Sequence, residues 1–203
     1  MNRNLGVLIS GRGSNLQALV DAIAAGRLNA SITIVISNRP EAEGLIRARM
    51  AGLETEVLDH RTFGSRSEYD AALVDRLRHH EVGLVCLAGF MRLLGAQFVE
   101  AFPNAVLNVH PSLLPAFPGV DAQRQALEHG TKVAGCTVHI VTAELDAGPI
   151  IAQRAVPVLP EDTVDSLSAR ILAEEHRLYP EAVATILAGG WTIEGRRFRQ
   201  RVS

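Results

Sequence analysis

An amide and an imidazole stand two residues apart where an apolar run of the sequence ends. Asn108 and His110 follow directly on Ala105–Leu107, and Pro111 fixes the chain behind them. Alternation along a strand over Ala105–Val109 places both side chains on one side. An amide donor can stabilise the oxyanion of an attacked carbonyl while an imidazole carries the proton. The pair therefore favours acyl transfer, with a structural histidine before a proline-fixed turn as the alternative.

A carboxylate suited to orient such an imidazole occurs further along the chain. Asp146 lies in the segment Glu144–Pro149, where it is equally typical of turn chemistry. Beside His110, it would orient the ring and raise the imidazole pKa. We expect His139 to be a core or sheet-edge histidine. Because no HxxxH or HExxH spacing is present, the sequence does not favour a metal site built from these three residues.

The covalent routes of acyl transfer have little support. No Gly-x-Ser-x-Gly segment is present, and neither Cys86 nor Cys136 has a neighbouring histidine or a helix start that would activate it. The sequence therefore favours attack by a nucleophile of the substrate itself, without a covalent enzyme intermediate.

A glycine-rich turn follows the first apolar run. In Gly11–Asn15 we expect backbone N–H groups at the start of a helix to face a phosphate, with Ser14 or Asn15 capping that helix. The dinucleotide fingerprint requires a third glycine where Leu16 stands and an acidic residue where Ser37–Arg39 stand. The loop thus favours a monophosphate over NAD, and a glycine turn without any ligand stays the alternative.

Buried strands and amphipathic helices alternate along the chain, which predicts an α/β protein with a Rossmann-like, mostly parallel sheet covered by helices on both faces. In the C-terminal half, neighbouring strands with few helices between them predict antiparallel pairing. The expected strands are 5–10, 32–37, 54–58, 83–88, 105–109, 133–142 and 150–158. The expected helices are 16–25, 42–51, 69–80, 95–101 and 164–187, the last interrupted or bent near Pro180, before a hairpin over 191–199 that turns at Glu194-Gly195.

Composition limits the class of protein. The 203 residues carry 20 basic and 22 acidic side chains, a formal charge of −2, which disfavours a polybasic nucleic-acid binder. The length suits one domain over 1–203, with a phosphate-binding half at about 1–100 and a catalytic half at about 101–203. Two cysteines, no charged leader and no apolar run of about 20 residues favour a soluble cytoplasmic protein.

Five sequence blocks together resemble the phosphoribosylglycinamide formyltransferase family of purine biosynthesis. The resemblance implies the formyltransferase fold and transfer of a formyl group from 10-formyltetrahydrofolate to a glycinamide amine, without a metal. The blocks are VLISGRGSNLQAL (7–19), LAGFMRLL (87–94), LNVHPSLLPAFPG (107–119), VHIVTAELDAGPII (138–151) and AEEHRLYP (173–180).

The resemblance also implies a role for each matching residue. Asn108 would hydrogen-bond the formyl oxygen and line the folate site, His110 would be the general acid, and Asp146 would hold it charged. The ribotide would contact Gly13, Ser14, Asn15 and, through its ribose, Glu175, for which a helix-surface glutamate is the alternative. The folate would contact Arg66, Met91, Arg92, Leu93 and Leu94.

The chain departs from the family pattern at Val120–Gln123, where many relatives carry histidines. Two related activities also use this core: methionyl-tRNA formyltransferase with an RNA-binding extension, and formyltetrahydrofolate deformylase with a regulatory one. Since we see neither extension, we expect small-molecule substrates, no nucleic acid or membrane partner, and a monomer or homodimer. A catalytically silent Rossmann-like binding module is the rival from another class.

Overall fold

The computed structural model describes residues 2–200, which form two compact units that divide after Asn108. The single domain over 1–203 stays a prediction. Among the described residues, no helix is both long and apolar enough to cross a membrane.

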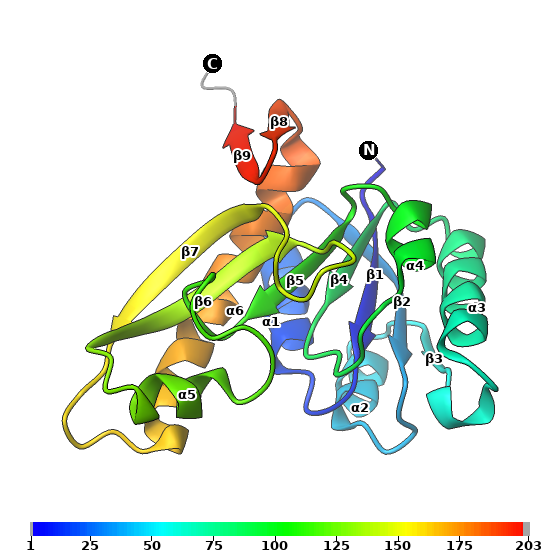
Figure 1. Ribbon diagram of the computed structural model, residues 1–203. Helices are drawn as coiled ribbons and strands as arrows, with labels where there is room; N and C mark the ends of the chain where they lie inside the picture. The colour runs from blue at the N-terminus through cyan, green and yellow to red at the C-terminus, as the bar shows by residue number, and fades with distance from the viewer. Residues whose placement is uncertain (1, 201–203) are drawn as a thin grey trace. The chain divides into compact units, whose positions relative to one another are not determined.

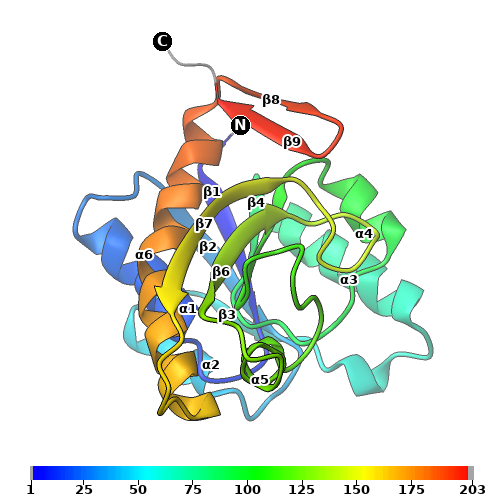
Figure 2. The same ribbon diagram turned by 60° about the vertical axis from the view of Figure 1, so that its left-hand side comes forward.

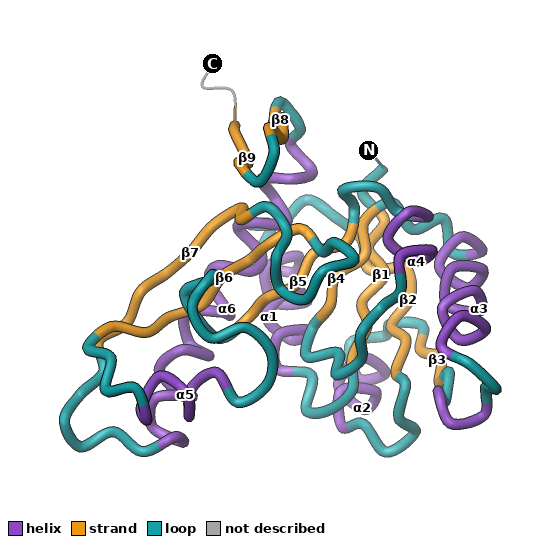
Figure 3. The backbone as a smooth tube through the Cα atoms, in the orientation of Figure 1, coloured by secondary structure: helices purple, strands orange, loops and turns teal. Residues whose placement is uncertain are grey.

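Strands and helices alternate along the first unit (Figure 3), as the sequence predicts. A short 3₁₀ turn over His60–Thr62, which the sequence analysis missed, precedes the third helix. The strands are β1 (Asn4–Ile9), β2 (Ser31–Ser37), β3 (Thr55–Val57), β4 (Leu84–Leu87) and β5 (Val106–His110), the last running two residues past the boundary. The helices are α1 (Ser14–Ala24), α2 (Glu43–Met50), α3 (Arg66–His79) and α4 (Ala96–Ala101).

The first unit contains a parallel sheet in the order β3-β2-β1-β4-β5. The order reverses at β1, because the chain first builds outward to β3 and then returns to add β4 (Figure 1). Right-handed crossovers therefore place α1 and α2 on one face and α3 and α4 on the other. The predicted α/β fold, with a parallel sheet covered on both faces, is confirmed here.

Continuous apolar runs make the centre of this sheet inaccessible to water. Leu5, Val7, Leu8 and Ile9 of β1 are all fully buried, as is most of β4. Such runs are typical of strands covered on both faces. The carboxyl ends of β1 and β4 are consequently rigid points from which the next loops leave.

The second unit is built on antiparallel pairs, also as predicted. β6 (Val133–Ile140) pairs with β7 (Ile150–Pro157), and the 25-residue α6 (Val164–Ala188) packs along both strands (Figures 1 and 2). The helix is continuous through Pro180, so the predicted interruption is wrong. The sequence analysis also missed α5 (Ala122–Glu128), which is only seven residues long.

The expected C-terminal hairpin is present, displaced by one residue at its turn. β8 (Trp191–Glu194) pairs antiparallel with β9 (Arg197–Gln200), and Glu194 lies opposite Arg197. The turn is therefore Gly195-Arg196 and not Glu194-Gly195. Gly195 has a φ of +61°, which explains why the turn is built around this glycine.

Two glycines allow the loop after β1 to lie against the start of α2. Gly13 is the N-cap of α1 in a left-handed conformation, with no side-chain cap, so the expectation that Ser14 or Asn15 caps this helix is wrong. A Cβ on Gly13 would lie 2.6 Å from the Cα of Gly44, and the Gly44 N–H donates to the Gly11 carbonyl at 2.9 Å. Backbone-to-backbone packing thus fixes the shape of the glycine loop.

We predict that Gly13→Ala destabilises the protein more than Gly26→Ala does. Both glycines have a φ near +70°, but a Cβ at Gly26 would meet nothing within 4 Å. The left-handed conformation alone costs about 1 kcal/mol, and the overlap with Gly44 adds about 1–3 kcal/mol. Urea unfolding of both variants measures the difference. Equal losses would show that the loop yields without cost.

Candidate functional site

Several polar groups of the second unit lie around the carboxylate of Asp146. The Oδ2 atom of Asp146 accepts a hydrogen bond from the Gly119 N–H at 2.7 Å and lies 3.4 Å from Nδ1 of His110. Its Oδ1 atom lies 3.7 Å from Nε2 of His139. All three side chains are at least nine-tenths buried. The loop between β6 and β7 thus brings Asp146 to His110, the arrangement that the predicted roles require.

The imidazole of His110 has an acceptor beside each nitrogen. Nδ1 faces the Asp146 carboxylate, and Nε2 lies 2.9 Å from the carbonyl oxygen of Phe117. A ring with a proton on both nitrogens can donate to both acceptors. Both nitrogens of the His110 ring therefore lie beside an oxygen atom that can accept a hydrogen bond.

The loop that supplies the Phe117 carbonyl is anchored to β6. The Leu114 N–H donates to Oγ1 of Thr137 at 3.0 Å, and the same hydroxyl donates to the Ser112 carbonyl at 2.7 Å. Ser112 in turn donates its hydroxyl to the Ala116 carbonyl at 2.5 Å. Phe117 itself has a φ of +52°, a conformation that favours glycine and stores strain in other residues. A rigid base therefore ends in a strained residue beside His110.

The segment Val120–Gln123, which departs from the family pattern, forms the start of α5. Asp121 is the N-cap, with a φ of +55°, and the Val120 carbonyl accepts from Nε2 of Gln125 at 2.8 Å. In this chain the segment therefore builds a helix start whose side chains are aliphatic or short and polar.

His139 is 2% exposed, so the expectation of a core histidine is confirmed, whereas its contact with Asp146 in the carboxylate cluster was not predicted. Its Nδ1 lies 3.0 Å from the Ile140 carbonyl, and burial lowers the pKa of the ring from its usual value of 6.5. The Ile140 carbonyl and Asp146 act in the opposite direction, and His110 acts with burial. Alternation from Val133 to Ile140 does place His139 on a definite face, but it does not show that Asp146 lies opposite.

Asn108 and His110 share the face of β5 that alternation predicts, because they are two residues apart on one strand. Asn108 is half-buried and His110 is 4% exposed. Glu175, on α6, is 6% exposed, so the alternative of a helix-surface glutamate is wrong. A buried carboxylate is retained where a specific group engages it.

The predicted phosphate-binding residues open α1 in the first unit. Ser14 is the first helical residue, directly behind the left-handed Gly13, and Asn15 is buried. The first N–H groups of a helix have no carbonyl partner within it, and the helix dipole favours negative charge at this end. The turn Gly13–Asn15 therefore has the geometry of an anion site.

The predicted folate residues surround a second polar cluster in the first unit. The Met91 and Leu93 side chains are 70% and 58% exposed, whereas Arg92 stacks over the Tyr69 ring at 5.1 Å. Asp70, four residues after Arg66 on α3, accepts the Gly95 N–H at 2.7 Å. Burial raises the pKa of this carboxyl, and the charges of Arg66 and Arg92 oppose that shift.

Arg66 is the first residue of α3, three residues earlier than the predicted helix start at Tyr69. The signal was in the sequence: Ser65 caps the helix by accepting the Glu68 N–H at 3.2 Å, and Glu68 accepts the Gly64 N–H at 2.9 Å. Ser65 thus acts as a side-chain N-cap, and Glu68 adds a bond to the residue before the cap, close to the arrangement of a capping box. It places the Arg66 side chain on the same helix face as Asp70.

Within residues 2–200, no group of three or more histidine, cysteine, aspartate or glutamate side chains is arranged to hold a metal ion. His110, His139 and Asp146 are close, but their contacts of 3.4 and 3.7 Å join the nitrogens to the carboxylate. The cluster has the geometry of ion pairs.

Comparison with known proteins gives consistent results. A family model described as formyl transferase matches residues 3–183. Phosphoribosylglycinamide formyltransferase of Escherichia coli is 44% identical over 193 residues, covering 95% of this chain and 88% of the relative. A crystal structure of glycinamide ribonucleotide transformylase 1 from Symbiobacterium toebii has a TM-score of 0.96 and 58% identity, covering 98% of this chain and 94% of that one.

A longer relative matches over a small part of its length. The trifunctional purine biosynthetic protein adenosine-3 of Drosophila melanogaster is 50% identical over 189 residues, which are 92% of this chain. The chain spans only 14% of that relative's length.

We predict that His139→Asn reduces the loss of stability at acidic pH. Because burial lowers the pKa of His139, the unfolded chain binds a proton below pH about 6.5 that the folded chain does not. Folded-state stability therefore falls as the pH decreases through that value. Urea unfolding at pH 7.5 and 5.5 should show a smaller drop for the variant than for the wild type. An equal drop would show that His139 is protonated in the folded protein.

Proposed function

Because this chain belongs to the formyl transferase family, we propose that it transfers the formyl group of 10-formyltetrahydrofolate to the amine of phosphoribosylglycinamide. The relatives from E. coli and S. toebii carry the names of this activity and are covered over most of their length. Within the structure, the observation that carries the proposal is the buried contact between His110 and Asp146.

In the proposed reaction, the glycinamide nitrogen attacks the formyl carbon, and the carbonyl oxygen becomes an oxyanion. The side-chain amide of Asn108 donates to this oxyanion, an interaction typically worth a factor of 100–1000 in rate. The tetrahedral intermediate then collapses by breaking the bond to the folate nitrogen. That nitrogen takes a proton from His110, and the proton lost by the glycinamide nitrogen returns to His110, so the net change moves one formyl group and one proton.

Asp146 has two functions in this proposal. Its carboxylate beside Nδ1 orients the ring, and its bond to the Gly119 N–H fixes the direction from which it faces His110. Delivery of the proton on Nε2 also requires that the contact with the Phe117 carbonyl open.

The two substrates are anionic, and the proposal assigns each a set of groups. The ribotide phosphate takes the backbone N–H groups of Gly13, Ser14 and Asn15 at the start of α1, and the ribose hydroxyls donate to Glu175. The folate lies along Met91, Arg92, Leu93 and Leu94 and extends its carboxylates to Arg66. A few positioned groups are thus enough to bind both anionic substrates, so the protein does not need a positive net charge, in agreement with its formal charge of −2.

The direct test combines purified protein, 10-formyltetrahydrofolate and phosphoribosylglycinamide and follows the deformylated folate. We expect donor consumption to require the ribotide and to match formylated ribotide mole for mole. Donor consumption at the same rate without ribotide would identify a hydrolase and overturn the proposal.

We predict that His110→Ala and Asp146→Ala each lose turnover by about 100- to 10,000-fold, the usual contribution of positioned proton transfer. Both variants should still bind the ribotide, because the assigned phosphate groups lie on α1. The matched control is His79→Ala, which removes an exposed imidazole from α3. Steady-state kinetics and calorimetric binding measure the two effects. Full turnover by either variant would contradict the proton-transfer roles.

A further inference from the structure

A buried serine at the end of β1 joins two segments that are 80 residues apart in the sequence. Ser10, 4% exposed, accepts the Met91 N–H on its hydroxyl oxygen at 2.8 Å and donates its own proton to Oδ1 of Asn38 at 2.6 Å. The Ser10 N–H also donates to the Gly89 carbonyl at 3.1 Å. Backbone and side chain of one residue therefore hold both ends of the segment 89–91.

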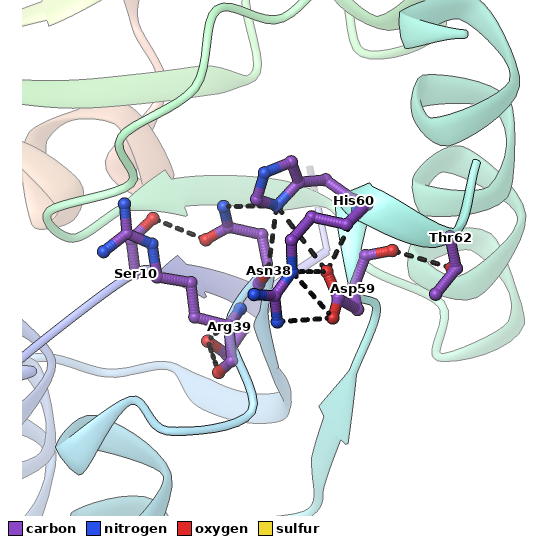
Figure 4. A network of polar contacts seen from close by, with 8 residues as sticks. Ser10, Asn38, Arg39, Asp59, His60 and Thr62 are labelled. Atoms are coloured by element: carbon purple, nitrogen blue, oxygen red, sulfur yellow. Dashed lines mark hydrogen bonds and ion pairs between the residues drawn. The ribbon is translucent and has the colours of Figure 1, made fainter. Parts of the chain in front are cut away.

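Asn38 fixes the direction of the serine hydroxyl. Its side chain is almost fully buried after β2, with Nδ2 lying 3.2 Å from Nδ1 of His60 (Figure 4). The same ring nitrogen lies 3.1 Å from the Asn38 backbone carbonyl. Because the Ser10 oxygen accepts from Met91, its proton must go to the acceptor that Asn38 presents. The bonds from the Met91 N–H to Ser10 and from the Ser10 hydroxyl to Asn38 thus run in one direction.

The hydrogen bond from Met91 to Ser10 holds the segment to which the proposed function assigns the folate. The Met91 side chain points to solvent and is 70% exposed, so the Met91 backbone is held from within chiefly by the Ser10 hydroxyl. Ser10 is also the residue immediately before Gly11, whose carbonyl receives the Gly44 N–H. We propose that Ser10, oriented by Asn38, is a positioning residue that sets the Met91–Leu94 backbone for the formyl donor.

This inference rests on the proposed function, since that function assigns Met91–Leu94 to the folate. It differs from general stabilisation, because the hydroxyl of Ser10 reaches only one of the two substrate segments. A neighbouring serine offers a comparison: Ser37 is fully buried at the end of β2, donates to the Arg39 carbonyl at 2.7 Å and accepts the Arg39 N–H at 3.1 Å. Like Ser10, Ser37 is buried and its hydroxyl both donates and accepts a hydrogen bond, but neither bond reaches the segment 89–91.

The experiment compares Ser10→Ala with Ser37→Ala in the full chain. We expect Ser10→Ala to raise the KM for 10-formyltetrahydrofolate by about tenfold, because the Met91 N–H loses its acceptor, while the ribotide KM changes less than about twofold. Ser37→Ala should lower the unfolding midpoint comparably and leave the donor KM unchanged. Asn38→Ala, which keeps the hydroxyl but removes its acceptor, should raise the donor KM by about threefold and covers the case in which Ser10→Ala does not fold.

Calorimetric binding of tetrahydrofolate, measured without ribotide, separates this inference from the proposed function. A Kd raised about tenfold in Ser10→Ala and unchanged in Ser37→Ala supports the positioning role even if the wild type transfers no formyl group. Equal rises in both serine variants, equal rises in both substrate KM values, or wild-type protein that does not bind tetrahydrofolate would each overturn it.

Discussion

The chemistry proposed for the second unit depends on the contacts of the Asp146 carboxylate. This carboxylate receives a backbone N–H from Gly119 and faces two histidine rings, one on each oxygen. A charge this deeply buried is stable only when several partners share it. The same contacts hold Asp146 against His110, so one set of contacts both buries the carboxylate and orients the proposed general acid.

In the first unit, the corresponding constraint is close packing of backbone at the carboxyl ends of parallel strands. The glycine loop lies against the start of α2 because Gly13 and Gly44 have no side chains to separate them. Ser10 and Asn38 then fix the next segment from the same edge of the sheet. Ligands of open α/β sheets bind at this edge, where the strand order reverses. The topology therefore brings the glycine loop and Met91–Leu94 to neighbouring strand ends.

Periodicity and residue type were sufficient for much of this architecture. The buried strands β1 and β4 and the antiparallel pair β6–β7 follow from apolar runs and the turns between them, and the motif at Asn108–Pro115 indicated His110 without any coordinates. A short helix and a helix start that depends on local capping were not predicted. α5 is too short for a periodic signal, and α3 starts at Arg66, behind an N-cap at Ser65 that was visible in the sequence but not used.

Contacts between distant segments could not be predicted from the sequence, for a physical reason. The pairing of His139 with Asp146 depends on the path of the loop 141–149, and the bond from Met91 to Ser10 depends on strand order. At Pro180 the sequence predicted an interruption that is not present. A proline breaks isolated helices, but it is tolerated in α6, where burial along β6 and β7 outweighs one missing hydrogen bond.

In the proposed mechanism the formyl group passes directly from the folate to the ribotide amine, while His110 transfers a proton and Asp146 orients the His110 ring. The most direct test uses a donor with a carbon-13-labelled formyl group, in the presence of excess unlabelled formate, and follows the label by mass spectrometry. We predict that all label lost from the donor appears in formylated ribotide. Label released as formate, or product diluted by unlabelled formate, would contradict direct transfer.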